Sequence, residues 1–211
     1  MTLISLVCCV SAVLLVVSPS MGRELPIGQL AAPSISHHNV HHHAAGHHRA
    51  HPKSCLDVPH RASGVYSIQP EWPFRDPILV YCDQEYETGG WAVIQRRFDG
   101  KLSFERPEMD YRYGFGNLDG EFWLGLENIY RLLNEAPHEL LVLLEDFNGN
   151  TSYARYDQFE IQKSEYYKIP QYTIRKCESY QGTAGNGWPL LIYNDAFKRG
   201  FSFSLWQGDK R

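Results

Sequence analysis

The fold of this chain is decided by three neighbouring stretches, GGWAVIQRRFDGKLSF (residues 89–104), YGFGNLDGEFWLGLENIYRLL (113–133) and ELLVLLEDFNGNTSYARYDQF (139–159). In the first stretch, side chains from Trp91 to Phe98 alternate with the two-residue period of a strand. Asp99-Gly100 is a strong hairpin signal, so Leu102 to Phe104 is expected to form the return strand. The dense aromatic residues also favour a fold rich in strands and loops.

The second stretch predicts a helix over residues 121–133. Its apolar residues recur with the spacing of one helix face, at Phe122, Leu126, Ile129 and Leu133. The third stretch predicts a hairpin, with a nearly continuous apolar strand at 140–147, a turn at Asn148-Gly149 and a partner strand at 153–161.

Weaker signals lie on both sides of these stretches. Two short strands are expected at 65–68 and 78–81, separated by a proline-rich segment, and no regular pattern continues after Tyr172. The expected fold class is therefore α+β, with a central antiparallel sheet and one helix packed across it.

The composition excludes one broad class of partner. The chain has 211 residues, a formal net charge of −4 and a pI near 6.2, and it contains no long run of Lys and Arg. Binding to nucleic acid needs a basic face, so no nucleic acid is expected as a partner. The length suits one domain with extensions.

The N-terminus predicts secretion. Residues 3–17 form a mostly apolar run that is too short for a membrane span of ~20 residues and that is followed by small residues. Residues 1–22 are therefore interpreted as a signal peptide, with cleavage near Ser20 or Gly22. The mature protein is expected to be secreted and extracellular, without a membrane span. No basic residue precedes the run, and a membrane anchor is the alternative interpretation.

Residues 23–53 are interpreted as a flexible, His-rich linker. Eight of the ten histidines fall between His37 and His51, and little in this segment could be buried. Imidazoles at this density favour weak, heterogeneous binding of Zn²⁺, Cu²⁺ or Ni²⁺. The Ala and Gly residues between them disfavour a fixed tetrahedral site.

Several short motifs resemble the C-terminal globular domain of fibrinogen, which recurs in ficolins, tachylectins and angiopoietin-like ligands. They are Gly89-Gly90-Trp91, Gly120-Glu121-Phe122-Trp123-Leu124-Gly125 and Leu144-Glu145-Asp146-Phe147, together with Cys55 and Cys82. The resemblance implies an extracellular binding module with a disulfide-braced N-terminal subdomain and a central antiparallel sheet with a packed helix. It places the domain at residues 54–211. Because the sequence stops at Arg211, it also implies that the C-terminal ligand-binding subdomain is incomplete.

The same resemblance pairs Cys55 with Cys82. Five cysteines are present, of which Cys8 and Cys9 would leave with the signal peptide. Closing the loop between Cys55 and Cys82 would stabilise the fold by ~3 kcal/mol. Cys177 would then be left over. It would be a free thiol, form an intermolecular bond that gives an oligomer, or lack a partner that is missing from this sequence.

The resemblance also implies a calcium loop near the end of the chain, where few ligands are present. Gln207 and Asp209 stand in the place of an acidic run, whereas Ca²⁺ usually takes 6–8 oxygen ligands. Asp209 is therefore interpreted as the remnant of a calcium loop, and calcium binding is not expected here. The sugar pocket of the family's lectins has no matching residue before Arg211.

No arrangement typical of an enzyme is found in the sequence. His138-Glu139 begins like the zinc-protease motif, but Val142 stands where the second histidine is needed. Residues 114–120 miss the dinucleotide-binding spacing by one residue, and no Gly-x-Ser-x-Gly elbow occurs. The chain is therefore interpreted as a non-enzyme that uses no cofactor.

Asn150-Thr151-Ser152 is an N-glycosylation sequon beside the predicted turn. Its position in a hairpin loop of a secreted chain favours a glycan on Asn150. The alternative is an unused sequon, in which Asn150 serves only the turn.

Two functions follow from these observations. The first is a secreted fibrinogen-related protein that binds glycans or acetylated sugars on microbial or cell surfaces in innate defence, with binding impaired by the incomplete C-terminal part. The alternative is a secreted protein-binding ligand, of angiopoietin-like or adhesion type, that acts on a receptor or matrix partner. Residues 23–53 hold neither heptads nor Gly-X-Y triplets, which favours the first function. A truncated product with little binding activity is a third interpretation.

Overall fold

The structure is a computed structural model that describes residues 10–19, 51–71, 73–166 and 168–186. In chain order its elements are β1 (Val10–Pro19), the 3-10 turn η2 (Cys55–Asp57), β2 (Gly64–Ile68), β3 (Ile78–Asp83), β4 (Trp91–Arg97), α1 (Glu108–Tyr113), β5 (Phe115–Gly116), β6 (Phe122–Trp123), α2 (Leu126–Leu133), β7 (His138–Asp146), β8 (Thr151–Tyr166) and β9 (Ile169–Gly182). Predictions for residues 1–9, 20–50 and 187–211 lie outside the described residues.

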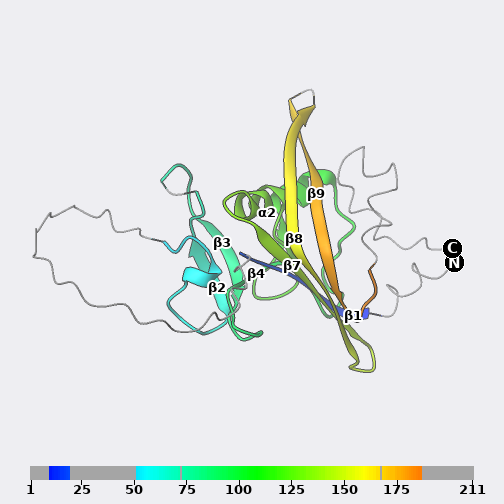
Figure 1. The fold of residues 1–211 in the computed structure, drawn as a ribbon. Helices are drawn as coiled ribbons and strands as arrows, with labels where there is room; N and C mark the ends of the chain where they lie inside the picture. Colours follow the sequence, from blue (N-terminus) through cyan, green and yellow to red (C-terminus); the bar gives the residue numbers. More distant parts are fainter. Residues whose placement is uncertain (1–9, 20–50, 72, 167, 187–211) are drawn as a thin grey trace, which may run out of the picture.

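All described strands belong to one nine-stranded antiparallel sheet (Figure 1). Its strands follow the order β2-β3-β4-β1-β7-β8-β9, and the short strands β5 and β6 attach beside β4. Helix α2 contacts the sheet at β8, and β8 and β9 form a long hairpin that extends beyond its neighbours (Figure 1).

The expected α+β class is confirmed. The strands expected at 65–68, 78–81, 91–98, 140–147 and 153–161 correspond to β2, β3, β4, β7 and β8, with small differences at their ends. The Asn148-Gly149 turn joins β7 to β8 as expected. In that turn Asp146 accepts hydrogen bonds from the backbone N–H groups of Asn148 and Asn150, which fixes the reversal of the chain.

Two predictions are wrong, one for the segment after Asp99-Gly100 and one for the start of the helix. Residues 102–104 form no strand, and helix α2 begins at Leu126 instead of residue 121. Glu121 explains both differences, because its buried carboxylate accepts hydrogen bonds from the backbone of the 98–102 loop and the next two residues form β6. The loss of pattern after Tyr172 is also misleading, since β9 continues to Gly182 by pairing along β8.

β1 consists of residues that the sequence assigns to a signal peptide. It pairs with β4 and with β7, antiparallel to both, at the centre of the sheet. This pairing does not test cleavage of the signal peptide, which stays a prediction. Among the described helices, none is long and apolar enough to cross a membrane.

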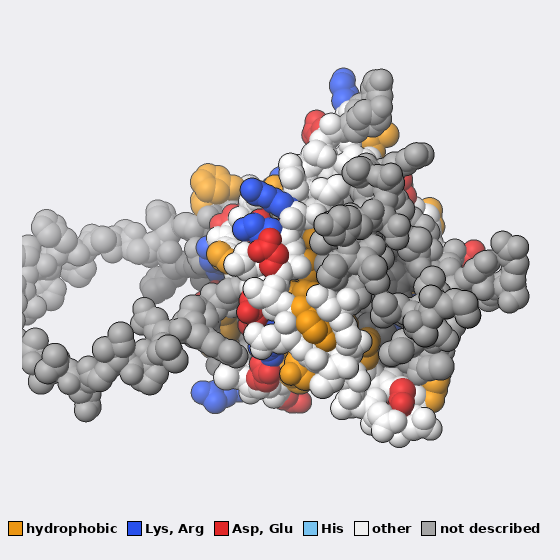
Figure 2. All heavy atoms as spheres, turned by 45° about the vertical axis from the view of Figure 1, so that its right-hand side comes forward, with side chains coloured by type: hydrophobic (Ala, Val, Ile, Leu, Met, Phe, Trp, Pro, Cys, Tyr) orange, Lys and Arg blue, Asp and Glu red, His pale blue; other side chains and the backbone are white. Residues whose placement is uncertain are grey.

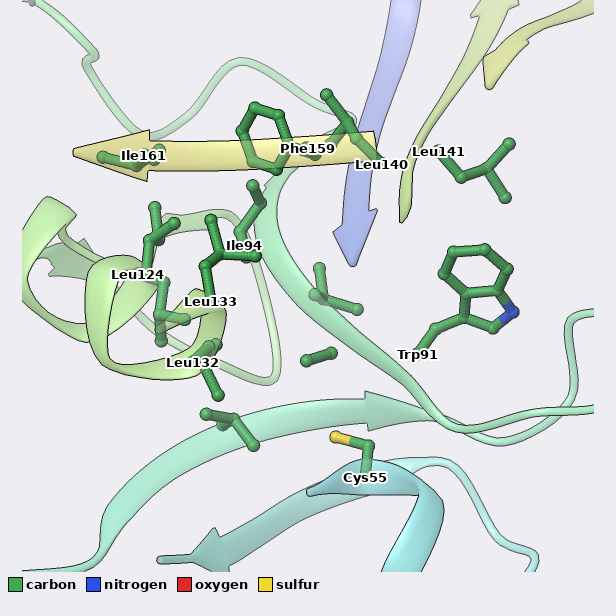
Figure 3. Packing of buried hydrophobic residues seen from close by; sticks show 14 of the residues in the cluster. Cys55, Trp91, Ile94, Leu124, Leu132, Leu133, Leu140, Leu141, Phe159 and Ile161 are labelled. Atoms are coloured by element: carbon green, nitrogen blue, oxygen red, sulfur yellow. The ribbon is translucent and has the colours of Figure 1, made fainter. Parts of the chain in front are cut away.

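The hydrophobic core lies between α2 and the sheet (Figure 3). Leu132 and Leu133 of α2 belong to the same cluster of buried hydrophobic residues as Ile94 of β4 and Ile161 of β8. Ile129 on the same helix is 0% exposed. Burying a side chain of this kind contributes about 1.5–3 kcal/mol. The short helix is therefore held by its apolar face, because an eight-residue helix is not stable by propensity alone.

Candidate functional site

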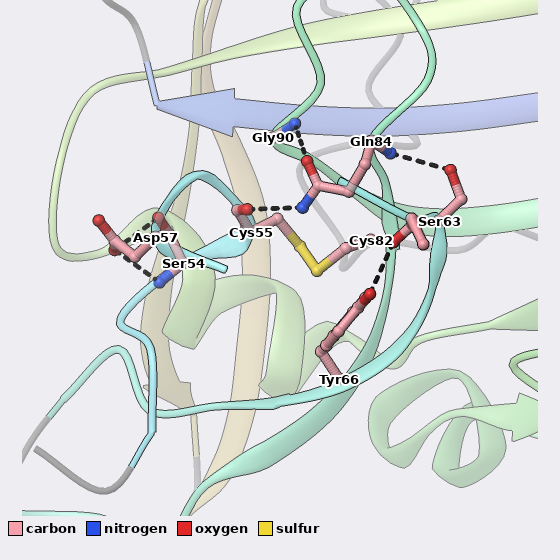
Figure 4. The surroundings of a disulfide bond; sticks show 9 residues. Ser54, Cys55, Asp57, Ser63, Tyr66, Cys82, Gln84 and Gly90 are labelled. Carbon is pink, nitrogen blue, oxygen red and sulfur yellow. Dashed lines mark hydrogen bonds between the residues drawn. A yellow bond between two sulfur atoms is a disulfide. The ribbon is translucent and has the colours of Figure 1, made fainter. Parts of the chain in front are cut away.

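The disulfide joins η2 to β3 at one end of the sheet (Figure 4). The two Sγ atoms of Cys55 and Cys82 are 2.03 Å apart, and both residues are buried. Gln84 braces the same place, because its Nε2 donates to the Cys55 carbonyl and its Oε1 accepts from the Gly90 N–H, each at 2.8 Å. The structure thus contains the disulfide-braced subdomain that the sequence motifs imply.

Gly90 explains why the Gly-Gly-Trp motif precedes β4. Its φ is +84°, and a Cβ atom at this position would lie 2.2 Å from Cδ2 of Leu56 in η2. Glycine therefore lets the disulfide-bearing turn approach the start of β4. The following Trp91 is buried, with the guanidinium of Arg155 5.5 Å above its ring. The motif therefore serves packing.

Glu121, from the second motif, holds the 98–102 loop. Its Oε1 accepts hydrogen bonds from the backbone N–H groups of Phe98, Asp99 and Gly100, and its Oε2 accepts one from Leu102, at 2.8–3.0 Å. Burial opposes the charge on this carboxylate, but the four hydrogen bonds outweigh burial and lower its pKa. Glu121 is therefore a structural anion that replaces the missing return strand.

A cluster of charged groups links α2 to the β8–β9 hairpin. This Glu127 cluster comprises Glu127, Lys163, Tyr172 and Arg75. The Lys163 ammonium donates to both carboxylate oxygens of Glu127 at 3.0 and 2.8 Å, and the Tyr172 hydroxyl donates to Oε2. Arg75 lies 3.3 Å from Oε1. The cluster fixes the hairpin against the helix.

The Glu127 cluster shifts two pKa values in opposite directions. Burial opposes the charge on Glu127, but the hydrogen bonds from Lys163 and Tyr172 outweigh it and lower the pKa of Glu127 to about 2. Burial, followed by the hydrogen bond to Glu127, raises the pKa of Tyr172. At physiological pH the carboxylate is therefore charged and the phenol is neutral.

Replacing Glu127 by Gln is expected to lower the free energy of unfolding by about 2 kcal/mol at pH 7, because Lys163 loses its charged partner. Since the pKa of Glu127 is lowered in the folded state, its contribution is present above pH ~4.3 and is lost as the pH falls toward about 2. Urea unfolding at pH 7, 4 and 3 measures this. The exposed Glu165→Gln variant is the control, and equal losses in both variants would contradict the prediction.

Beside the Glu127 cluster, the surface is hollowed into an open groove of about 670 Å³. The groove lies between the end of α2 and the β8–β9 hairpin, and its lining mixes charged, polar and aliphatic side chains: Tyr130, Leu133, Asn134, Glu135, Ala136, Pro137, Glu160, Ile161, Gln162, Lys163 and Arg175. On the face in Figure 2, Lys and Arg side chains are interspersed with Asp and Glu beside a group of hydrophobic side chains. Such a lining suits polar contacts with a partner more than enclosure of an apolar ligand.

The remaining predicted site residues do not converge on this groove. Asn150 is exposed at the end of the turn, directly before β8, and its Nδ2 donates to Asp146 at 2.8 Å. Asp209 and most of the histidine-rich segment lie outside the described residues. Within the part of the chain that is described, no group of three or more His, Cys, Asp or Glu side chains could hold a metal ion.

Cys177 is a free cysteine on β9, opposite Phe159 of β8. It packs against the hydrophobic core, and burial raises the pKa of its thiol. A protonated, inward-packed thiol reacts slowly with other thiols. The alternatives that the sequence leaves open for Cys177 stay predictions.

Sequence reasoning missed the residues that organise this region. Glu121 stands inside a recognised motif, so a carboxylate directly before the aromatic pair Phe122-Trp123 was the available signal. The sequence gave no signal for the contact of Glu127 with Lys163 and Tyr172. These two residues follow Glu127 by 36 and 45 positions, and they meet it only when β8 and β9 fold onto α2.

Comparisons with known proteins agree with this architecture. Residues 51–211 match the family model described as the fibrinogen beta and gamma chains, C-terminal globular domain. Angiopoietin-related protein 2 of Mus musculus is 44% identical over 134 residues, which covers 63% of this chain and 26% of that protein. Microfibril-associated glycoprotein 4 of Bos taurus is 45% identical over 119 residues, covering 52% of this chain and 46% of that protein. The chain thus spans between about a quarter and a half of the length of these relatives.

Solved structures show the same fold. The fibrinogen-like globe domain of human ANGPTL2 superposes with a TM-score of 0.58 at 41% identity, covering 66% of this chain and 63% of that one. The lamprey fibrin D-dimer, solved in complex with a Gly-His-Arg-Pro-amide peptide, gives a TM-score of 0.54 at 32% identity, covering 71% of this chain and 47% of that one. With its disulfide-braced turn, antiparallel sheet and packed helix, the chain belongs to the family of the fibrinogen C-terminal globular domain.

Proposed function

We propose that this chain is a secreted, non-enzymatic binding protein whose fibrinogen-like domain binds a protein on a cell surface or in the extracellular matrix. The observation that carries the proposal is its 44% identity to angiopoietin-related protein 2 over 134 residues. The similarity to microfibril-associated glycoprotein 4 points the same way. Protein binding is the alternative function that the sequence left open, and these relatives favour it over glycan binding.

The glycan-binding function has less support among the described residues. Its one expected determinant in this sequence, the calcium-loop remnant at Asp209, lies outside the described residues. The two relatives described above are an angiopoietin-related protein and a microfibril-associated glycoprotein, and these names favour a protein partner. Glycan recognition is therefore the competing outcome of the test.

The groove beside the Glu127 cluster is the surface that we assign to the protein partner. It combines Tyr130, Arg175 and Glu160 in an open, polar hollow, and tyrosine and arginine are enriched where proteins bind one another. The related lamprey structure was solved with a peptide ligand, which supports a polypeptide as the class of ligand.

Binding of the purified, labelled chain to intact cells, measured by flow cytometry, tests the proposal. We expect binding to be lost when surface proteins are removed by trypsin, and to persist after treatment with glycosidases or addition of N-acetylglucosamine. If glycosidase treatment and the free sugar abolish binding to cells that keep their surface proteins, the lectin function is favoured instead.

Two charge-reversal variants locate the surface. Arg175→Glu is expected to weaken binding about tenfold or more, since the 66%-exposed Arg175 side chain lines the groove. Arg61→Glu reverses an exposed charge outside the groove and should leave binding unchanged. Equal effects of the two variants would remove the groove from the proposal.

Asn150 is expected to carry a glycan when the chain passes through a eukaryotic secretory route, because it is exposed at a turn. Digestion with an N-glycanase should lower the apparent mass of the secreted protein. Thr151→Ala should abolish this shift, and Thr151→Ser should keep it because the sequon survives. An unchanged mobility of the wild-type protein would show that the sequon is unused.

A further inference from the structure

Phe74 is the most exposed large hydrophobic residue in the part of the chain that the structure describes, at 87% exposed. It belongs to the loop of residues 70–77, which joins β2 to β3. A single exposed apolar residue is common on protein surfaces and needs no function to explain it. Phe74 differs from such a residue because the backbone around it is held from several sides, and because its loop adjoins the groove that we assign to the protein partner.

A buried arginine of α2 fixes the loop on both sides of Phe74. The guanidinium of Arg131 donates from Nε to Oε2 of Glu71 and from Nη2 to the carbonyl oxygen of Asp76, each at 2.6 Å. Only 10% of the Arg131 side chain and 14% of the Glu71 side chain are exposed, so solvent screens this ion pair weakly. The loop is thus tied to the helix both before and after the aromatic residue.

The backbone next to Phe74 is also hydrogen-bonded within the loop. Its N–H donates to the carbonyl oxygen of Glu71 at 2.8 Å, and Nε2 of Gln69 donates to the carbonyl oxygen of Arg75 at 2.7 Å. Pro73 directly precedes Phe74 and restricts the loop further, because the proline ring fixes φ. The aromatic ring therefore projects from a backbone that is already ordered, which lowers the entropy lost when it binds.

The loop and the groove meet at the carboxylate of Glu127. Nη1 of Arg75, the residue that follows Phe74, lies 3.3 Å from Oε1 of Glu127. Lys163, which lines the groove, donates to the same oxygen at 3.0 Å. On the loop side lies a second, smaller hollow of about 380 Å³, lined by Gln69, Pro73, Phe74, Arg75, Asp76 and Arg131. The two hollows are therefore neighbours on one surface, joined through the Glu127 cluster.

The smaller hollow leaves one charge for a partner. Asp76 is exposed, and among the described residues its carboxylate takes part in no ion pair or hydrogen bond. By contrast, the two arginines of this hollow already contact carboxylates: Arg75 those of Glu71 and Glu127, and Arg131 that of Glu71. A surface that docks here gains free energy by burying the neighbouring aromatic ring and by placing a positive charge against Asp76.

We propose that Phe74 is an anchor residue of the partner-binding surface, and that its ring inserts into an apolar pocket of the protein partner whose rim carries a basic group facing Asp76. This inference rests on the proposed function and extends the binding surface from the groove, past the Glu127 cluster, to the 70–77 loop. Aromatic side chains that enter a desolvated pocket carry a large share of the binding energy of an interface.

Substitution of Phe74 in the full chain tests the anchor, with binding of the labelled protein to intact cells as the measurement. We expect Phe74→Ala to weaken binding about tenfold or more, and the apolar Phe74→Leu to weaken it by only about threefold. Phe147→Ala is the matched control and should bind like the wild type, because Phe147 is 76% exposed at the β7–β8 turn and lines neither hollow. Equal binding of the two alanine variants would overturn the proposal. So would a lower urea midpoint for Phe74→Ala, since the ring would then serve the fold.

The charge of Asp76 is tested separately. Asp76→Asn keeps the side-chain volume and removes the charge, so it should weaken binding about threefold, and more at low than at high salt. Glu105→Gln removes an exposed charge that lines neither hollow and should leave binding unchanged. Equal binding of these two variants would exclude a basic rim on the partner.

A photoreactive phenylalanine analogue shows what the ring enters. At position 74 it should cross-link to a surface protein of the cells, whereas at position 147 it should not, and trypsin treatment of the cells should abolish the cross-link. Binding that survives trypsin but is lost in Phe74→Ala would place the ring in lipid and exclude a protein pocket. If Arg175→Glu weakens trypsin-sensitive binding and Phe74→Ala does not, only this inference fails. If the wild type shows no trypsin-sensitive binding, the proposed function fails with it.

Discussion

Replacing Gly125 by Ala is expected to lower the free energy of unfolding by roughly 3–5 kcal/mol. Gly125 precedes α2 with φ at +97°, a conformation that disfavours any residue with a Cβ atom. A Cβ at this position would also lie 2.5 Å from the carbonyl carbon of Tyr113 and 2.6 Å from the backbone nitrogen of Gly114. Both contacts are backbone atoms, so relief requires α1 to move away from the start of α2.

Gly149→Ala separates the effect of backbone conformation from the effect of the close contact. Gly149 has φ at +81°, but no atom lies within 4 Å of the position that its Cβ would take. The expected loss is therefore only about 1–2 kcal/mol. Urea unfolding of both variants at pH 7 measures the difference. Equal losses would mean that the approach of α1 to α2 does not restrict this glycine.

Removal of the Glu121 carboxylate is expected to have an effect of similar size. In Glu121→Ala, the N–H groups of residues 98, 99, 100 and 102 lose their acceptors, and the free energy of unfolding should fall by roughly 3–5 kcal/mol. Glu121→Gln keeps the side-chain volume but turns one oxygen into a donor, so we expect most of the loss to remain. Glu105→Gln changes an exposed carboxylate nearby and should cost less than about 0.5 kcal/mol.

The same carboxylate gives a pH signature. Hydrogen bonding in the folded state lowers the pKa of Glu121 against the opposing effect of burial. Its stabilisation is therefore fully present above pH ~4.3 and is lost as the pH falls through the folded-state pKa. The stability gap between the wild type and Glu121→Gln should shrink as the pH is lowered from 7 to 3. A constant gap would show that the carboxylate does not carry the effect.

The differences between the predicted and the observed elements have one common cause. The strands at β4, β7 and β8 were predictable because alternation and an Asn-Gly turn act among residues that are close in the chain. The return strand after Asp99-Gly100 was predicted by the same rule and does not form, because Glu121 reaches back 19 to 23 residues to take its hydrogen bonds. The Glu121 carboxylate takes the backbone N–H groups that the expected hairpin would have paired. The local sequence pattern around Asp99-Gly100 contains no sign of this distant acceptor.

By itself, the sequence determined the fold class, the main strands, the turn at Asn148-Gly149 and the family motifs, because each depends on side-chain order within a short segment. The tertiary structure decided three other features: the role of Glu121 as a structural anion, the meeting of Glu127 with Lys163 and Tyr172, and the position of residues 10–19 inside the sheet. An apolar run looks the same whether it enters a membrane or a sheet. Only the two buried edges of β4 and β7 define which backbone groups it can pair with, and those edges come together when distant parts of the chain fold.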